Sequence, residues 1–203
     1  MHTLQARHIA AAVAVAFGFT LAAAPALAKD DEHEHRGRLV ATKLSGFNEV
    51  HFVAAPTPAL RGAISSPASG SFKAAIDDTA QLITYELNYK DLGSAVQQAH
   101  IHFGQRHTVG GIVVWLCQTT AVPAPAAVAA VTPFCPQDTT GGPVTGTILP
   151  AQVLAQAAQG FAALAFDELV RAIRAGAAYV NVHSATFAPG EIRGQLEAHR
   201  HGH

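Results

Sequence analysis

Hydrophobic and polar residues alternate over short stretches along most of the chain. Within residues 81–89, the odd-numbered positions from Ile83 to Tyr89 are apolar or aromatic, and the positions between them include Thr84 and Glu86. A period of two with β-branched and aromatic residues on one side indicates a half-buried strand. The same reasoning predicts strands at 39–44, 70–76, 98–103, 111–117, 178–183 and 191–196.

Seven short strands separated by Gly and Pro turns predict an all-β domain, a Greek-key-like antiparallel β-sandwich. One or two short helices are expected as connections. Residues 166–175 have helical spacing, with acids in the first turn, arginines in the last and Gly176 just beyond. Residues 150–157 predict a second, shorter helix that begins at a proline.

The first 28 residues predict a secretory signal peptide. A start containing Arg7 leads into an apolar stretch, and Ala26-Leu27-Ala28 provides a small-residue cleavage signal. A membrane anchor is the alternative, but the apolar run is short of the ~20 residues that a span needs. We therefore expect an exported protein, periplasmic or extracellular, with no membrane span after cleavage.

The composition is apolar, at 49% hydrophobic and 13% charged, with 12 His and a net charge of −1. Disorder of the whole chain is excluded, because it requires low hydrophobicity and high net charge. Nucleic-acid binding is not expected either, since 13 basic and 14 acidic residues give no basic field. The signal peptide and an Ala/Pro-rich stretch at 121–134 account for much of the apolar excess.

The two cysteines, Cys117 and Cys135, predict a disulfide. An even pair close in sequence in an exported protein forms a disulfide more often than a metal or redox site, and the Cys-x-x-Cys spacing of thiolate ligands is absent. The bond would clamp residues 118–134 into a surface loop, because three prolines there disfavour regular structure.

Polar, His-rich tails flank the predicted domain at 29–38 and 199–203, leaving residues 39–198 for the fold. Such tracts can hold metal weakly, although terminal charged runs are usually only solvated.

Three histidines on predicted strands are candidate metal ligands. His100 and His102 are two apart, so on a strand they share a face, with Cβ atoms roughly 7 Å apart. His183 ends another predicted strand, on the same face as Tyr179 and Asn181. Imidazole suits copper and zinc. The alternative is a structural role, with each ring hydrogen-bonded to backbone or carboxylate; His51 and His107 are weaker candidates in loops.

Glu191 and Arg193 share one face of the strand that follows Pro189-Gly190. With Asn181 they could support a metal site, the carboxylate by orienting a metal-bound imidazole and the guanidinium by steering an anion. The alternative is a structural Glu/Arg network that closes the sandwich.

Three segments together carry a family resemblance: Leu44-Ser-Gly-Phe-Asn-Glu49, then Ala99-His-Ile-His102 followed by 110–116, and lastly 176–196 with its Tyr-Val-Asn-Val-His and Pro-Gly-Glu-Ile-Arg-Gly-Gln motifs. They resemble the CHRD domain, the repeat first described in chordin, over residues 39–198. The chain departs from the pattern at His51-Phe52 and in the loop bounded by the cysteines. The resemblance implies an extracellular β-domain without an established enzymatic activity.

A second, local similarity links His100-Ile-His-Phe-Gly104 to copper/zinc superoxide dismutases, where both histidines of the matching segment bind copper. It implies a superoxide-dismutase-like sandwich, with an immunoglobulin-like one as the alternative. It also makes His100 and His102 copper-ligand candidates. The zinc loop of the dismutases has no counterpart here.

We therefore favour a binding or interaction module that holds one copper or zinc ion through the three histidines, with a protein or another envelope component as partner. The alternatives are a copper redox enzyme of dismutase type and a structural envelope protein without metal. We favour a function without catalysis, so no catalytic residue is assigned.

Cleavage after Ala28 predicts that the exported protein begins at Lys29. Intact-mass spectrometry of protein recovered from outside the cytoplasm should give the mass of residues 29–203. A terminus at Met1 or His2 would contradict the signal-peptide assignment.

Overall fold

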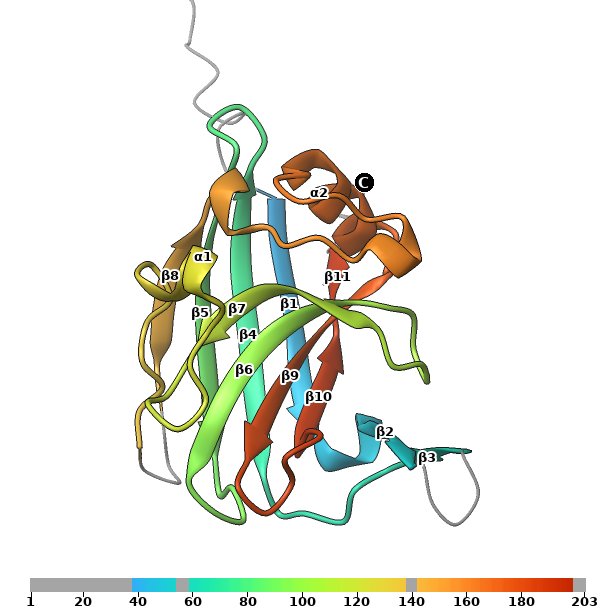
Figure 1. Ribbon diagram of the computed structural model, residues 1–203. Coiled ribbons are helices and arrows are strands. Elements are labelled where there is room, and N and C mark those ends of the chain that lie inside the picture. The colour runs from blue at the N-terminus through green and yellow to red at the C-terminus, as the bar shows by residue number, and fades with distance from the viewer. Residues whose placement is uncertain (1–37, 54–58, 138–141, 199–203) are drawn as a thin grey trace, which may run out of the picture. The chain divides into compact units, whose positions relative to one another are not determined.

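The computed structural model describes residues 38–53, 59–137 and 142–198 (Figure 1). The predicted signal peptide, the predicted amino-terminal tail up to residue 37 and the carboxyl-terminal tail lie outside the described residues. Within those ranges, no helix is long and apolar enough to cross a membrane.

One antiparallel sheet of nine strands forms the body of the domain, in the order β7-β6-β9-β10-β1-β4-β5-β8, with β11 also paired to β1. A separate two-stranded sheet pairs β2 with β3. The bounds are β1 Arg38–Ser45, β2 Val50–Val53, β3 Ala59–Gly62, β4 Ser69–Asp77, β5 Leu82–Lys90, β6 Val96–Phe103, β7 Gly111–Cys117, β8 Val144–Ile148, β9 Ala178–Ser184, β10 Ile192–Gln195 and β11 Glu197–Ala198.

The sheet curls on itself, so that β6 and β7 pass in front of β4 and β5 (Figure 1). Tyr85 on β5 donates a hydrogen bond of 2.7 Å to the Leu116 carbonyl on β7, across the interior. The main hydrophobic core collects inward-facing residues from both halves of the sheet, among them Phe72, Leu87 and Ile101. The prediction of an all-β antiparallel fold is confirmed, and the layers expected of a sandwich belong to one continuous, nearly closed sheet.

The predicted helix at 166–175 is confirmed as α2 (Phe166–Arg174), with Asp167 and Glu168 in its first turn. Its end is a Schellman motif, because the Ala177 and Gly176 N–H groups donate to the Ala172 and Ile173 carbonyls at 2.8 and 3.1 Å. Gly176 has a left-handed backbone conformation there, with φ of 67°. Glycine adopts this conformation without steric cost, which explains why the helix ends where the sequence predicts.

The expected helix at 150–157 is wrong. Only Pro150–Gln152 forms a 3-10 turn, and a second one follows at Ala157–Gln159. Between them the Leu154 N–H donates to the Val113 carbonyl on β7 at 2.9 Å. Contact with the sheet therefore outweighs the helical propensity of this segment.

The predicted disulfide joins Cys117 to Cys135, 18 residues apart. The loop it closes is more structured than expected, since one helical turn, α1 (Ala126–Ala129), begins directly after Pro125. Val128 and Ala124 pack with Trp115 in a second small hydrophobic cluster. The loop thus covers the outward face of β7.

Strands β2, β3, β8 and β11 are not among the predicted ones. β8 does alternate in burial, but Gly146 leaves only two apolar side chains, Val144 and Ile148, to mark the period in the sequence. β2 and β3 pair only with each other. Short edge strands of this kind are defined by their partners more than by their own sequence.

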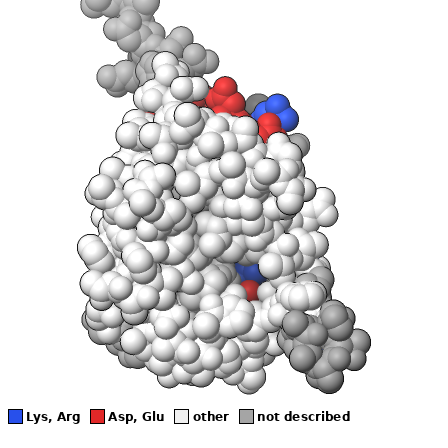
Figure 2. Space-filling view, in the orientation of Figure 1, with Lys and Arg blue, Asp and Glu red and all other residues white. Residues whose placement is uncertain are grey.

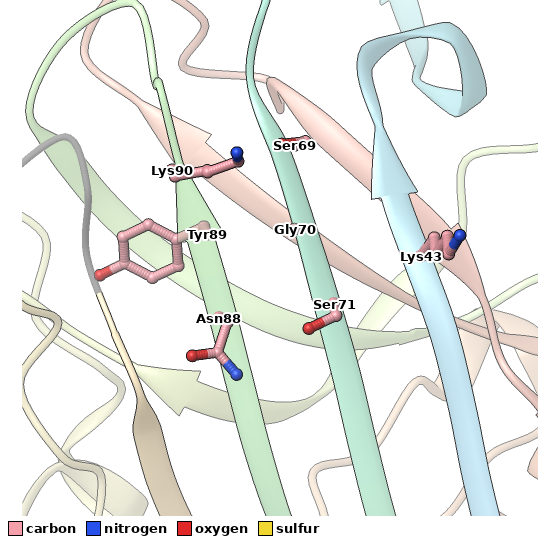
Figure 3. A pocket seen from close by; sticks show the side chains of 7 residues that line it. All are labelled: Lys43, Ser69, Gly70, Ser71, Asn88, Tyr89 and Lys90. Atoms are coloured by element: carbon pink, nitrogen blue, oxygen red, sulfur yellow. The ribbon is translucent and has the colours of Figure 1, made fainter.

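The outward face of β1, β4 and β5 is polar and shallowly hollowed. A depression of about 390 Å³ there is lined by Lys43, Ser71, Asn88 and Lys90, among others. Figure 3 shows these side chains on the three adjacent strands. The depression lies on different strands from the histidine pair of β6, so this polar hollow and the candidate metal ligands are separate features.

Removing the disulfide with the double change Cys117→Ala and Cys135→Ala should lower the free energy of unfolding by about 3 kcal/mol, because the unfolded chain regains the entropy of an 18-residue loop. Urea unfolding followed by Trp115 fluorescence measures the change. An unaltered midpoint would show that the loop is held by its packing alone.

Candidate metal site

The alternation predicted for β6 and β9 places apolar side chains on one face of the sheet and imidazoles on the other. Ile101 and Val180 point into the hydrophobic core, while His100 and His102 project from the opposite face of β6. β6 and β9 are antiparallel neighbours, with Gln98 opposite His183. All three imidazoles therefore gather on the outward face, as the spacing predicts.

The three rings converge closely. One ring nitrogen from each of His100, His102 and His183 lies within 4.8 Å of the other two. His100 Nδ1 and His183 Nε2 are 3.2 Å apart. Two nitrogens bound at 2.0–2.1 Å to one tetrahedral ion would be about 3.3 Å apart, so this pair already has a suitable separation.

Backbone carbonyls fix the orientation of two of the rings. His102 Nδ1 is 3.0 Å from the Gly110 oxygen, and His183 Nδ1 is 2.8 Å from the Ala188 oxygen. A carbonyl only accepts, so both Nδ1 atoms carry the proton and both Nε2 atoms present a lone pair. Metal-bound histidines are commonly held in this way.

The rings are buried, with exposed fractions of 0% for His100, 8% for His102 and 6% for His183. Among the described residues, the Nε2 atoms of His100 and His102 find no hydrogen-bond partner. Buried polar atoms are usually paired, so the orphaned Nε2 of His102, which presents a lone pair, fits a site that accepts a cation together with the close pair of His100 Nδ1 and His183 Nε2.

Burial also keeps the rings neutral. It lowers the pKa of His100 well below 6.5, an effect increased by the neighbouring His183 and His102. It lowers the pKa of His102 to about 3 and that of His183 to about 4, although their bonds to carbonyls oppose the shift. At neutral pH a metal ion would therefore not compete with protons for these nitrogens.

Aromatic packing holds the cluster on two sides. The His102 ring stacks on Tyr179, with centroids 4.7 Å apart and 3° between planes, and the Arg193 guanidinium lies 3.4 Å from the centre of the same Tyr179 ring. Trp115 meets His100 edge-on, with centroids 4.3 Å apart. The rings thus have little rotational freedom.

Arg193, only 2% exposed, is the most deeply buried cation of the described residues. Its two terminal nitrogens donate to the Thr108 and Gln105 carbonyls at 2.7 and 2.9 Å, which anchors the loop that also supplies Gly110. Through these bonds, Arg193 fixes the position of this loop relative to the sheet. Figure 2 shows few charged groups on this side of the molecule: acidic and basic groups near the top, and one basic and one acidic patch at the bottom of a hollow lower down.

Asn181 lies opposite His100 and Arg193 on the neighbouring strands. Its Nδ2 donates to a carboxylate oxygen of Glu49, and its Oδ1 is buried without a partner. Glu49 is 2% exposed, and sequence reasoning did not select it as a site residue. Its place in the Leu44–Glu49 motif was the available signal.

Glu191 bonds to a serine hydroxyl and a backbone N–H and not to an imidazole. Its Oε1 accepts from the Ser66 hydroxyl at 2.5 Å and from the Gly93 N–H at 2.8 Å. The bend before it depends on Gly190, whose φ is 134° and where a Cβ would lie 2.6 Å from Asn181 Nδ2. His51, in β2 and not in a loop, reaches the Gly190 oxygen at 2.7 Å.

The fold and the cluster define an all-β domain with a buried histidine triad on one face of its sheet. The model of the CHRD domain family matches residues 40–196, and the chain belongs to that family. Searches of curated proteins and of solved structures each give no match.

Burial raises the pKa of Glu49 to about 7, against the opposing effects of its bond from the Val50 N–H, of Arg193 and of Asn181. The folded protein therefore holds a proton that the unfolded chain releases near pH 4.5, and this residue's contribution to stability falls as the pH rises from about 4.5 to 7.

Glu49→Gln should remove that dependence. The free energy of unfolding of the wild type relative to the variant should fall by roughly 3 kcal/mol, to order of magnitude, between pH 4 and pH 8. Urea unfolding at a series of pH values measures it, and Glu86→Gln, at an exposed site, is the control. A constant difference between wild type and Glu49→Gln would contradict the burial argument.

Proposed function

We propose that this CHRD domain is an exported binding module that holds one copper or zinc ion through His100, His102 and His183. The observation that carries the proposal is the convergence of three neutral, buried imidazoles whose Nε2 atoms are either unpaired or directed at a neighbouring ring. When bound, the ion would supply a Lewis-acidic centre and a cross-link between β6 and β9.

The protein's own groups would position the ligands. The Gly110 and Ala188 carbonyls keep the protons on Nδ1 of His102 and His183. Arg193 and Tyr179 pack beneath His102. Asn181 and Glu191 would contribute indirectly. Asn181 would act through its bond to Glu49, and Glu191 by holding the turn that precedes β10.

Export is supported by the amino-terminal leader pattern and by the Cys117–Cys135 disulfide, a bond favoured in oxidising compartments. A copper redox enzyme of dismutase type would need its substrate to reach the ion. The exposed fractions of 0–8% at the three rings favour an ion that is held over one that turns over substrate.

Calorimetric titration of the exported chain with Zn²⁺, and with Cu²⁺ in parallel, tests the site. The wild type should bind one ion tightly, and the double variant His100→Gln and His102→Gln should lose that site, with an affinity at least about 100-fold weaker. His107→Gln is the matched control from a loop. Near-ultraviolet circular dichroism should confirm that each variant is folded.

His-rich tracts such as the terminal tails can hold metal weakly, so a tail variant separates their contribution from that of the triad. Changing all of them to Asn should leave the tight site intact; they are His33, His35, His199, His201 and His203. Equal stoichiometry in the wild type and the triad variant, or loss of the site in the tail variant, would refute the triad as the binding site.

A further inference from the structure

The triad differs from most protein metal sites in the charge of its donors. Among the described residues, the cluster that could hold an ion contains three imidazoles and neither a carboxylate nor a thiolate. Both cysteines form the disulfide, so neither provides a thiolate ligand. A bound ion would therefore keep its full positive charge in the site.

Glu49, the buried acid bonded to Asn181 beside the triad, offsets this charge only in part. Both carboxylate oxygens of Glu49 accept bonds from its own neighbours, Oε1 from the Val50 N–H at 3.0 Å and Oε2 from Asn181. Burial also raises the pKa of Glu49 to about 7, which leaves it partly protonated at neutral pH.

A fixed positive charge lies close to the triad. The Arg193 guanidinium carbon is 3.4 Å from the centre of the Tyr179 ring, and that centre is 4.7 Å from the centre of the His102 ring, which places the charge within about 8 Å of the imidazole. Repulsion from Arg193 is twice as large for a divalent ion as for a monovalent one.

The cost of desolvation also favours a monovalent ion over a divalent one. The cost of moving an ion from water into a poorly polar site scales with the square of its charge. Here the rings are 0–8% exposed, and the cluster of Trp115, Ala124 and Val128 covers the side next to His100. A dication therefore loses about four times as much solvation as a monocation of the same size.

The number of donors leads to the same conclusion. Zinc in proteins is four-coordinate, and a site with three protein ligands adds water or substrate as the fourth. Monovalent copper, with a filled d shell, is satisfied by two or three neutral nitrogen donors. Three buried imidazoles match the second requirement.

We infer that the triad of His100, His102 and His183 selects monovalent copper over divalent zinc, because three neutral, buried donors beside the fixed charge of Arg193 favour the ion of lower charge and lower coordination number. This inference rests on the proposed function and specifies its ligand as Cu⁺.

Competition with chromophoric chelators tests the preference on the exported chain carrying the tail changes to Asn. Cu⁺ is kept reduced with ascorbate under nitrogen and titrated against bathocuproine disulfonate, and Zn²⁺ is titrated against 4-(2-pyridylazo)resorcinol. The dissociation constant for Cu⁺ should be at least about 1,000-fold below that for Zn²⁺. X-ray absorption at the copper edge should show three nitrogen neighbours.

Arg193→Met tests the electrostatic part of the argument. Removing the charge should increase Zn²⁺ affinity more than Cu⁺ affinity, so that the selectivity falls by about tenfold or more. Arg171→Met, an exposed change of the same net charge, should leave the selectivity unaltered. If Arg193→Met fails to fold, the comparison of Cu⁺ and Zn²⁺ affinities in the protein with Arg193 decides whether the inference holds.

The outcomes separate the two proposals. Binding of neither ion by the tail variant would overturn the proposed function together with this inference. Binding of both ions through the triad with Zn²⁺ equal or tighter would overturn the inference and leave the metal module standing. Unchanged selectivity in folded Arg193→Met would refute the role given to its charge.

Discussion

The structure depends on burying polar side chains on the outward face of β6, β9 and β10. Buried polar groups are costly unless they are hydrogen-bonded, and the loops over this face supply the partners. Arg193 bonds to the Thr108 and Gln105 carbonyls, and His102 and His183 bond to those of Gly110 and Ala188. The imidazole Nε2 atoms of His100 and His102 are left without partners, so the metal proposal follows from an incomplete set of hydrogen bonds.

The same contacts join segments that are far apart in the sequence. The stack of Arg193, Tyr179 and His102 connects three strands, and the bond from Asn181 to Glu49 ties the start of β2 to β9. Because the rings are held by stacking and by backbone carbonyls, the triad is preorganised, and binding an ion would require little rearrangement. This rigidity is also why charge and coordination number, more than adaptation of the site, should decide which ion is held.

Much of this arrangement was predictable from local patterns. Alternation placed Ile101 inward and the two histidines of β6 outward, because side chains on a strand alternate strictly between faces. The acids, arginines and terminal Gly176 marked α2, and the two cysteines predicted their bond. The helix expected at 150–157 failed because Leu154 bonds to β7, an interaction that no local pattern encodes. Glu49 was missed as a site residue for a similar reason, since its partner Asn181 is 132 residues away.

The period-two strands, the shared face of the three triad histidines, the disulfide pair and the family motifs can all be read from the sequence. The tertiary structure was needed to show that β6 and β9 are neighbours, that Arg193 is buried against Tyr179, and that Glu191 bonds to Ser66 and Gly93 and not to an imidazole. The physical reason is that strand geometry is set by adjacent residues, whereas desolvation, hydrogen-bond partners and local charge are set by whichever distant segments the curled sheet brings together.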